Sequence, residues 1–150
     1  AKRDEDVDKC GWGATVFLPG EAVALDAYGP CSVVPSDAWF VGAVKLSNNI
    51  AELNGVIHVL EWMASSSVAP VASIVIAYDS EYARCMACGT WKPRCNYAII
   101  NRAKRALARA SAAGVNISWL HIDSHTGVVG NDRADGLADL GARSFLRSLW

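Results

Sequence analysis

Residues 73–80 read SIVIAYDS, and this stretch decides the fold that we expect. Its first six residues are a nearly continuous apolar run, as expected of a central β-strand that is buried on both faces. Asp79 and Ser80 follow at once and can begin a helix. A buried strand that passes directly into a helix is typical of α/β proteins, whose ligands usually bind at the carboxyl edge of the sheet.

The sequence before this junction predicts strands followed by a helix. Residues 12–18 and 22–28 alternate in polarity around Pro19-Gly20 and predict a hairpin. Residues 39–44 predict a third strand. A helix then begins at Ser47 or Asn48, because apolar residues recur at helical spacing. These residues are Ile50, Leu53, Ile57, Leu60 and Met63.

The sequence after the junction predicts more helices and one more buried strand. A second helix starts at Asp79, a third covers about 98–113, a strand covers 116–122, and a last helix covers roughly 131–146. The order is β-β-β-α-β-α-α-β-α. The expected fold is therefore α/β, a mixed sheet flanked by helices.

The composition is that of one folded domain. Of the 150 residues, 52% are hydrophobic and 19% are charged, which suits a sizeable core and not a disordered tail. No apolar run reaches the roughly 18 residues that span a membrane, and no secretory signal opens the sequence. The chain begins within the charged segment AKRDEDVDK. We expect residues 1–150 to be a monomeric domain of a longer protein.

Basic residues gather in one part of the chain. Residues 82–122 contain no acidic residue but seven of the fourteen lysines and arginines, although the net charge is only −1. A single such charge is usually just a solvated side chain. For a block with charges of only one sign, a surface that faces a polyanion is at least as good an explanation as solvated side chains. Its members are Arg84, Lys92, Arg94, Arg102, Lys104, Arg105 and Arg109.

The five cysteines are an odd number without regular spacing. This argues against a disulfide framework and predicts a reducing, intracellular compartment. Cys85 and Cys88 form a CxxC, and with His121 and His125 they raise the possibility of a zinc site. The two pairs are too far apart for a zinc finger, and the CxxC falls in a predicted helix. Buried structural cysteines are the favoured interpretation.

Three carboxylates lie where strands are predicted to lead into helices. Glu52 is in the first turns of its helix, Asp79 ends the apolar strand, and Asp135 is early in the last helix. Each has an ordinary explanation: Glu52 meets a helix dipole, Asp79 caps a helix, and Asp135 is exposed beside Asp139. As a cluster they would repel one another without divalent cations, and hard oxygen ligands select Mg²⁺ or Mn²⁺.

Four segments of the chain resemble the ribonuclease H type 1 family, in the form found as cellular and retroelement domains. In order they are GWGATVF, SNNIAELNGVIHVLEWM, VIAYDSEYA and HTGVVGNDRADGLADLGA. The match runs over nearly the whole chain. SNNxxELN, apolar-x-DS-x-Y and HxGxxGNxxAD are specific together, although any one alone is weak. The resemblance implies a ribonuclease H-like fold.

The resemblance also implies an endonuclease that uses two Mg²⁺ ions, which Mn²⁺ can replace, to cut the RNA strand of an RNA/DNA hybrid to 5′-phosphate and 3′-hydroxyl ends. Glu52, Asp79 and Asp135 match the family's metal-binding carboxylates. Asp79 would contact both ions, and Asp135 the ion that carries the attacking water. His125 matches the loop histidine that relays a proton and helps the product to leave. Taken alone, His125 would be an ordinary loop histidine.

Several positions match residues with which the family binds its substrate: Asn48, Asn49, Ser80, Glu81 and Asn131. By resemblance, Asn48 and Asn49 lie in the minor groove of the hybrid, where the 2′-hydroxyl distinguishes RNA from DNA. Glu81 departs from the family, which often has glutamine there. The acid-free block, with Trp91, would contact phosphates of the other strand.

The family's first metal ligand is absent from its expected place. It is an aspartate in a DGS-like turn before the Gly-Trp-Gly-like segment, and counting back from Trp12 at the family's spacing leaves the chain. Asp4, Asp6 and Asp8 are not followed by Gly-Ser. We interpret the first strand and its aspartate as truncated, with Asp4 as a poor substitute.

Three functions are therefore weighed. The first is a hybrid-cutting nuclease domain, once attached to a reverse transcriptase or another retroelement protein. The second is a catalytically incomplete module, or decayed fragment, that only binds hybrids or RNA. The third is a zinc-binding adaptor built from the CxxC and HxxxH. The presence of Glu52, Asp79, His125 and Asp135 in one chain favours the nuclease.

Overall fold

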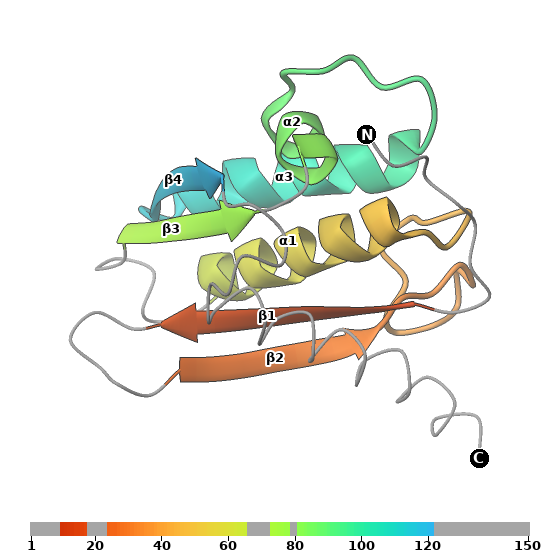
Figure 1. The fold of residues 1–150 in the computed structure, drawn as a ribbon, viewed down its shortest axis with the longest axis horizontal. Coiled ribbons are helices and arrows are strands. Elements are labelled where there is room, and N and C mark those ends of the chain that lie inside the picture. Colours follow the sequence, from red (N-terminus) through yellow and green to blue (C-terminus); the bar gives the residue numbers. More distant parts are fainter. Residues whose placement is uncertain (1–9, 18–23, 66–72, 79–80, 122–150) are drawn as a thin grey trace.

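The structure, a computed structural model, describes residues 10–17, 24–65, 73–78 and 81–121. Strands and helices are interspersed along this part of the chain, which confirms the α/β class (Figure 1). The predicted helix over 131–146 lies outside the described residues. The elements are β1 (Gly11–Phe17), β2 (Ala24–Pro30), α1 (Asn48–Ser65), β3 (Ser73–Tyr78), α2 (Glu81–Cys88), α3 (Tyr97–Ala112) and β4 (Asn116–His121).

The four described strands form two separate two-stranded sheets. β1 and β2 are the predicted hairpin and pair antiparallel, with Trp12 opposite Gly29. β3 and β4 pair parallel, from Ser73 opposite Asn116 to Tyr78 opposite His121. Both kinds of pairing that a mixed sheet requires are therefore present. The parallel pair places the end of β3 next to the end of β4, at the edge where the sequence predicts a site.

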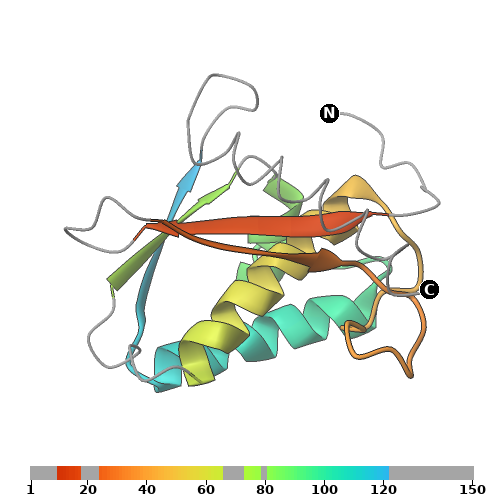
Figure 2. The same cartoon turned by 90° about the horizontal axis from the view of Figure 1, so that it is seen from below.

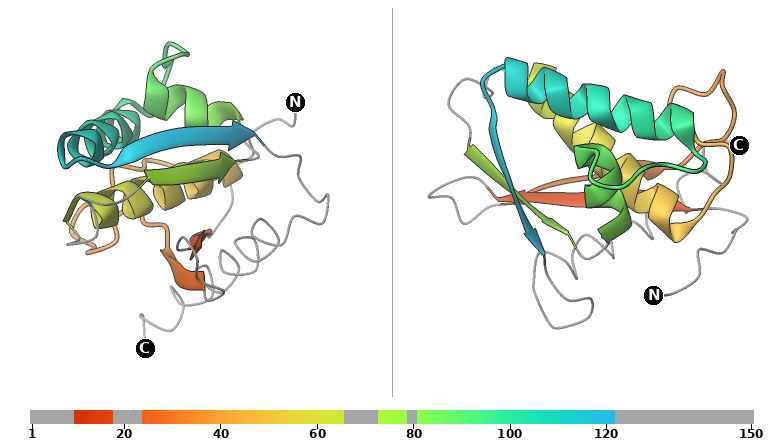
Figure 3. Two further views of the ribbon diagram at one scale, coloured as in Figure 1. Left: turned by 90° about the vertical axis from the view of Figure 1, so that its left-hand side faces the viewer. Right: turned by 90° about the horizontal axis from the view of Figure 1, so that it is seen from above.

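Helix α1 lies between the hairpin and α3 (Figures 1 and 3). The hairpin crosses one side of α1, as seen from below in Figure 2. The predicted apolar stripe of α1 is confirmed, because all five of its side chains are buried. α3 presents small buried residues, Ala103, Ala106 and Ala110, which allow the two helices to approach closely.

The prediction of a strand over 39–44 is wrong. The segment between β2 and α1 is a series of turns, in which the Phe40 N–H donates to Asp37 O at 3.1 Å and Gly42 has a φ of +111°. Val41 and Ala43 are buried in the core beside α3. Val41 and Ala43 are thus buried at every second position, as in a strand. Within the described part of the chain, however, this segment pairs with no strand.

The prediction that β3 and β4 are buried on both faces is also wrong. Val75 of β3 and Leu120 of β4 are 63% and 53% exposed. Ile76 and Ile117 instead pack against the core formed by α1 and α3. Only one face of the β3–β4 pair is therefore covered within the described part of the chain. No helix in that part is long and apolar enough to cross a bilayer.

Candidate active site

The N-terminus of α1 holds three of the predicted site residues. Ser47 caps the helix, because the Ile50 N–H donates to its Oγ at 3.2 Å. Asn48 is exposed at the first helical position, whereas Asn49 and Glu52 are half-buried. The first turn of α1 contains no acidic residue. Glu52 therefore lies beyond the turn in which the helix dipole acts strongly, which weakens the ordinary explanation for this carboxylate.

The same half of α1 is pressed against β1. A Cβ at Gly55 would lie 3.6 Å from Gly13 O and 3.8 Å from Trp12 Cβ, so the helix is close to the strand at this residue, with room for ordinary contact. Ala51 packs on a small cluster that contains Trp12. Glu52, between Ala51 and Gly55, consequently sits on backbone that is fixed by the hairpin.

The carboxyl ends of β3 and β4 meet beside the start of α2. Tyr78 and His121 are opposite each other in the parallel register, with ring centroids 5.3 Å apart. α2 begins at Glu81 and buries Ala83 in the same core cluster as Leu53 of α1. The sheet edge, the first turn of α2 and the N-terminal half of α1 therefore adjoin.

His121, the first histidine of the HxxxH, is exposed and forms an unpredicted contact. Its Nε2 lies 3.7 Å from Glu81 Oε1, and both side chains are nearly half exposed. Glu81 Oε2 also accepts a long contact from Cys85 Sγ at 3.7 Å. Glu81 stands where the family often has glutamine. In this chain its neighbour is the His121 imidazole at the end of β4. Only the parallel register reveals this neighbour, because forty positions separate the two residues.

Six predicted site residues lie outside the described part of the chain: Asp4, Asp79, Ser80, His125, Asn131 and Asp135. Their placement stays a prediction. Within the described residues no group of three or more histidines, cysteines and carboxylates is arranged to hold a metal ion.

The CxxC has one buried and one exposed thiol. Cys85 is buried on α2, as expected of a structural cysteine, but Cys88 and Cys95 are exposed. The interpretation of buried structural cysteines is therefore wrong for these two. Burial raises the pKa of Cys88, while Arg84 opposes the shift.

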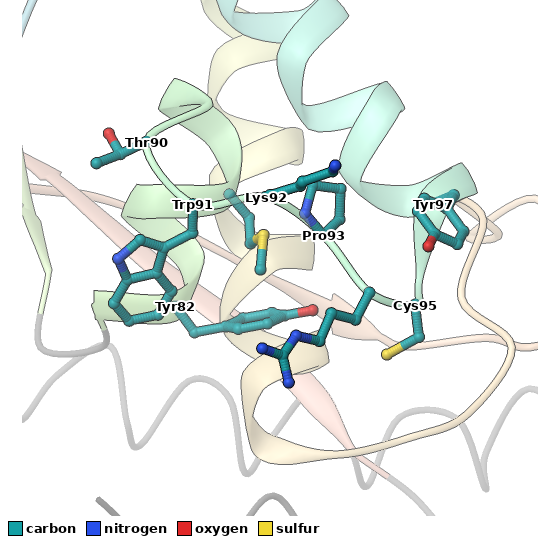
Figure 4. A pocket seen from close by; sticks show the side chains of 9 residues that line it. Tyr82, Thr90, Trp91, Lys92, Pro93, Cys95 and Tyr97 are labelled. Atoms are coloured by element: carbon teal, nitrogen blue, oxygen red, sulfur yellow. The ribbon is translucent and has the colours of Figure 1, made fainter.

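Trp91 lies in an open hollow of about 920 Å³ between α2 and α3 (Figure 4). The loop 89–96 forms much of its wall, together with Tyr82 of α2 and Tyr97 at the start of α3. Lys92 and Arg94 add two cations to these aromatic rings. The hollow therefore offers flat apolar faces with positive charge beside them.

One arginine of the basic block is bound to other parts of the chain. Arg102 donates two hydrogen bonds to the Glu61 carboxylate and one to Phe40 O, so it joins α3 to α1 and to the loop before it. Its shortest nitrogen–oxygen distance to Glu61 is 2.8 Å. Arg102 is thus an internal anchor, whereas Lys92 and Arg94 face the hollow.

An aromatic cluster fastens the hairpin to α1. The His58 ring stacks on Trp12 at 4.5 Å between centroids and meets the edge of Trp39 at 5.8 Å. A Cβ at Gly29 would lie 2.5 Å from a ring carbon of Trp39, so this position requires glycine. Burial lowers the pKa of His58; Glu61 opposes the shift and Arg102 adds to it. The His58 side chain is half-buried.

Comparison with known proteins places these elements in a family. The family model for RNase H matches residues 12–143. Human ribonuclease H1 is 34% identical over 53 residues, which are 35% of this chain and 18% of the human protein. The aligned segment therefore spans less than a fifth of that relative's length.

Two solved structures share the fold. One is the N-terminal RNase H domain of a Mycobacterium tuberculosis protein, solved as a fusion with maltose-binding protein; its TM-score is 0.61 at 17% identity, covering 95% of this chain and 96% of that one. The other is RNase H1 from the archaeon Halobacterium salinarum, with a TM-score of 0.51 at 19% identity, covering 89% and 96%. With the family model matching most of its length, the chain belongs to the ribonuclease H family, type 1.

Proposed function

We propose that this chain cuts the RNA strand of RNA/DNA hybrids internally, leaving 5′-phosphate and 3′-hydroxyl ends. The observation that carries the proposal is the position of Glu52, on a helix that is fixed against β1 and shares a core with α2, the helix that starts just after β3 and Asp79. Family membership supports the reaction class.

Glu52, Asp79 and Asp135 would hold two Mg²⁺ ions, with Mn²⁺ as a substitute. The donor set fits such ions, because carboxylate oxygens are the ligands that hard divalent cations prefer. Bound ions would supply an activated water and neutralise charge on the leaving 3′-oxygen. His125 would relay a proton and help the cut strand to leave.

Asn48 and Asn49 would contact the minor groove of the hybrid. Asn48 is exposed at the first position of α1, and Asn49 beside it is half-buried. Both amides therefore lie in the first turn of the helix that carries Glu52. Ser80 and Asn131 would add polar contacts on either side of the metal-binding carboxylates. The RNA strand would be recognised through its 2′-hydroxyl.

The hollow around Trp91 would receive the DNA strand. Its aromatic rings can stack on bases or sugars, and Lys92 and Arg94 can neutralise phosphates. We also propose that residues 1–150 act inside the cell as a monomeric domain of a retroelement protein, next to a reverse transcriptase. The form of the motifs supports this origin.

A catalytically incomplete hybrid-binding module is the second candidate. It is favoured by the hollow around Trp91, whose aromatic rings and two cations can bind a nucleic acid strand without any metal-binding carboxylate. Both candidates predict hybrid binding, and only the nuclease predicts cleavage.

The test is cleavage of a hybrid labelled on its RNA strand, with Mg²⁺ or Mn²⁺, by the native chain and by Asp79→Asn. Asp37→Asn is the matched control, because it removes one carboxylate but keeps the oxygen that accepts the Trp39 N–H. We expect the native chain and the control to cut and Asp79→Asn to bind without cutting.

Two outcomes would contradict the nuclease. Hybrid binding without cleavage would show that residues 1–150 alone do not cut, and would favour the binding module for this part of the protein. Equal cleavage by Asp79→Asn would show that the activity does not come from this site. Stoichiometric zinc in the purified protein would instead support the adaptor.

A further inference from the structure

Two cysteines that the proposed function does not use face each other across the open end of the hairpin. The register of β1 and β2 pairs Gly11 with Pro30, and the Cys31 N–H donates to Cys10 O at 3.0 Å. Cys10 and Cys31 are therefore the next opposite pair, directly before β1 and directly after β2. Residues opposite each other in an antiparallel pair project their side chains to the same face.

The backbone separation at this position suits a disulfide. Opposite residues that share backbone hydrogen bonds stand about 5.5 Å apart between Cα atoms. Natural disulfides join Cα atoms about 4.4–6.8 Å apart. The usual Cα separation of such a pair therefore falls within the range that a disulfide spans.

The two thiols already interact. The side chain of Cys31 hydrogen bonds to that of Cys10, and this bond and burial raise the pKa of Cys31. Both side chains are buried, beside Trp12. A thiol that keeps its proton is a poor nucleophile, which disfavours Cys31 as the first sulfur to react.

We propose that Cys10 and Cys31 form a reversible disulfide by exchange with a small-molecule disulfide such as oxidised glutathione. The Cys10 sulfur attacks one sulfur of the reagent, forms a mixed disulfide and releases one glutathione thiol. The Cys31 sulfur then attacks the Cys10 sulfur and releases the second thiol. The protein loses two electrons and two protons, which reduce one oxidised glutathione to two molecules of glutathione.

The other described cysteines do not offer an equivalent pair. Cys85 is buried on α2, whereas Cys88 and Cys95 are exposed. Exposed thiols react with glutathione singly, so they are expected to carry mixed disulfides. The internal crosslink is therefore distinguishable from general thiol oxidation, because it joins two cysteines of the chain whereas a mixed disulfide joins one cysteine to glutathione.

The crosslink would lie beneath the start of α1. Leu46 and Ala51 pack on the cluster formed by Cys10, Trp12 and Cys31. A disulfide across the open end of the hairpin would therefore restrain the same helix that carries Asn48, Asn49 and Glu52. The inference itself does not depend on hybrid cleavage, because it concerns only the chemistry of the two sulfurs.

The experiment exposes the full chain to a series of reduced and oxidised glutathione mixtures, then blocks remaining thiols in denaturant and maps peptides without reduction. We expect one internal crosslink, Cys10–Cys31, which disappears when excess reduced glutathione is added. The melting temperature of the oxidised chain should rise by about 5–10 °C, because a closed loop restricts the unfolded state.

Variants separate this bond from other oxidation. Cys31→Ala should abolish the crosslink and the rise in melting temperature, whereas Cys88→Ser should retain both. Full alkylation of Cys10 and Cys31 in the most oxidising mixture would overturn the proposal, as would a crosslink of either residue to another cysteine. The peptide map of the native chain decides this even if Cys31→Ala fails to fold.

Discussion

Replacing Gly55 by alanine should stabilise the protein, because α1 leaves just enough room for a methyl group against β1. Its two nearest neighbours would be Gly13 O at 3.6 Å and Trp12 Cβ at 3.8 Å, both ordinary contact distances. Glycine inside a helix is less favourable than alanine by about 0.8–1.0 kcal/mol. Burial of the methyl group adds part of the roughly 0.8 kcal/mol that a buried methylene contributes.

The expected gain is therefore about 1–1.5 kcal/mol in the free energy of unfolding. At about 2–4 °C per kcal/mol for a chain of this size, the melting temperature should rise by roughly 2–6 °C. Urea unfolding followed by circular dichroism would measure the free energy, and calorimetry the temperature.

Gly42→Ala is the matched control, since it adds the same methyl group where the structure forbids it. Gly42 has a φ of +111°, and its Cβ would lie 2.8 Å from the Ile99 nitrogen. This variant should lose about 2 kcal/mol or more. If Gly55→Ala also destabilised the chain, α1 would have to pack more tightly on β1 than these distances show, and the reasoning would be refuted.

Three further predictions follow from named contacts. In a double-mutant cycle, Arg102→Ala and Glu61→Ala should show a coupling of about 0.5–1 kcal/mol that weakens with salt, because the pair is partly exposed; zero coupling in low salt would contradict an anchoring role. The lowered pKa of His58 means that the unfolded chain binds its proton more tightly. Stability should therefore be complete above about pH 6.5 and fall as the pH drops through the folded pKa, and His58→Phe should lose that part of the dependence in melting curves from pH 7 to 5. Leu53→Ala should cost about 2–5 kcal/mol in urea unfolding, since Leu53 is fully buried; a loss below 1 kcal/mol would mean that the core refills the space.

Local patterns predicted the elements that bury one continuous face. The stripe of α1 follows a helical period, and a single capping residue, Ser47, fixes its start. β3 was predicted with the bounds that it has, because an apolar run ends abruptly at Tyr78. In each case the deciding signal lies within a few residues of the element.

The errors arose where burial comes from distant parts of the chain. The alternation in 39–44 reflects packing of Val41 and Ala43 near α3, and such packing produces the same pattern as a strand. The exposed faces of β3 and β4 depend on which helices cover them. The contacts of Glu81 with His121 and of Cys10 with Cys31 depend on strand register, which composition and spacing do not determine.

The anchoring of the loop 31–47 by Arg102 has a consequence for synthesis of the chain. Arg102 binds Phe40 O, 62 positions earlier in the sequence, and Gly42 lies against Ile99 of the same helix. A ribosome that adds about 5–20 residues per second makes Phe40 roughly 3–12 s before it makes Arg102. During that interval the nascent loop lacks its anchor while Val41 and Ala43 await α3. The emerging polypeptide is therefore most dependent on chaperones before its third helix has left the ribosome.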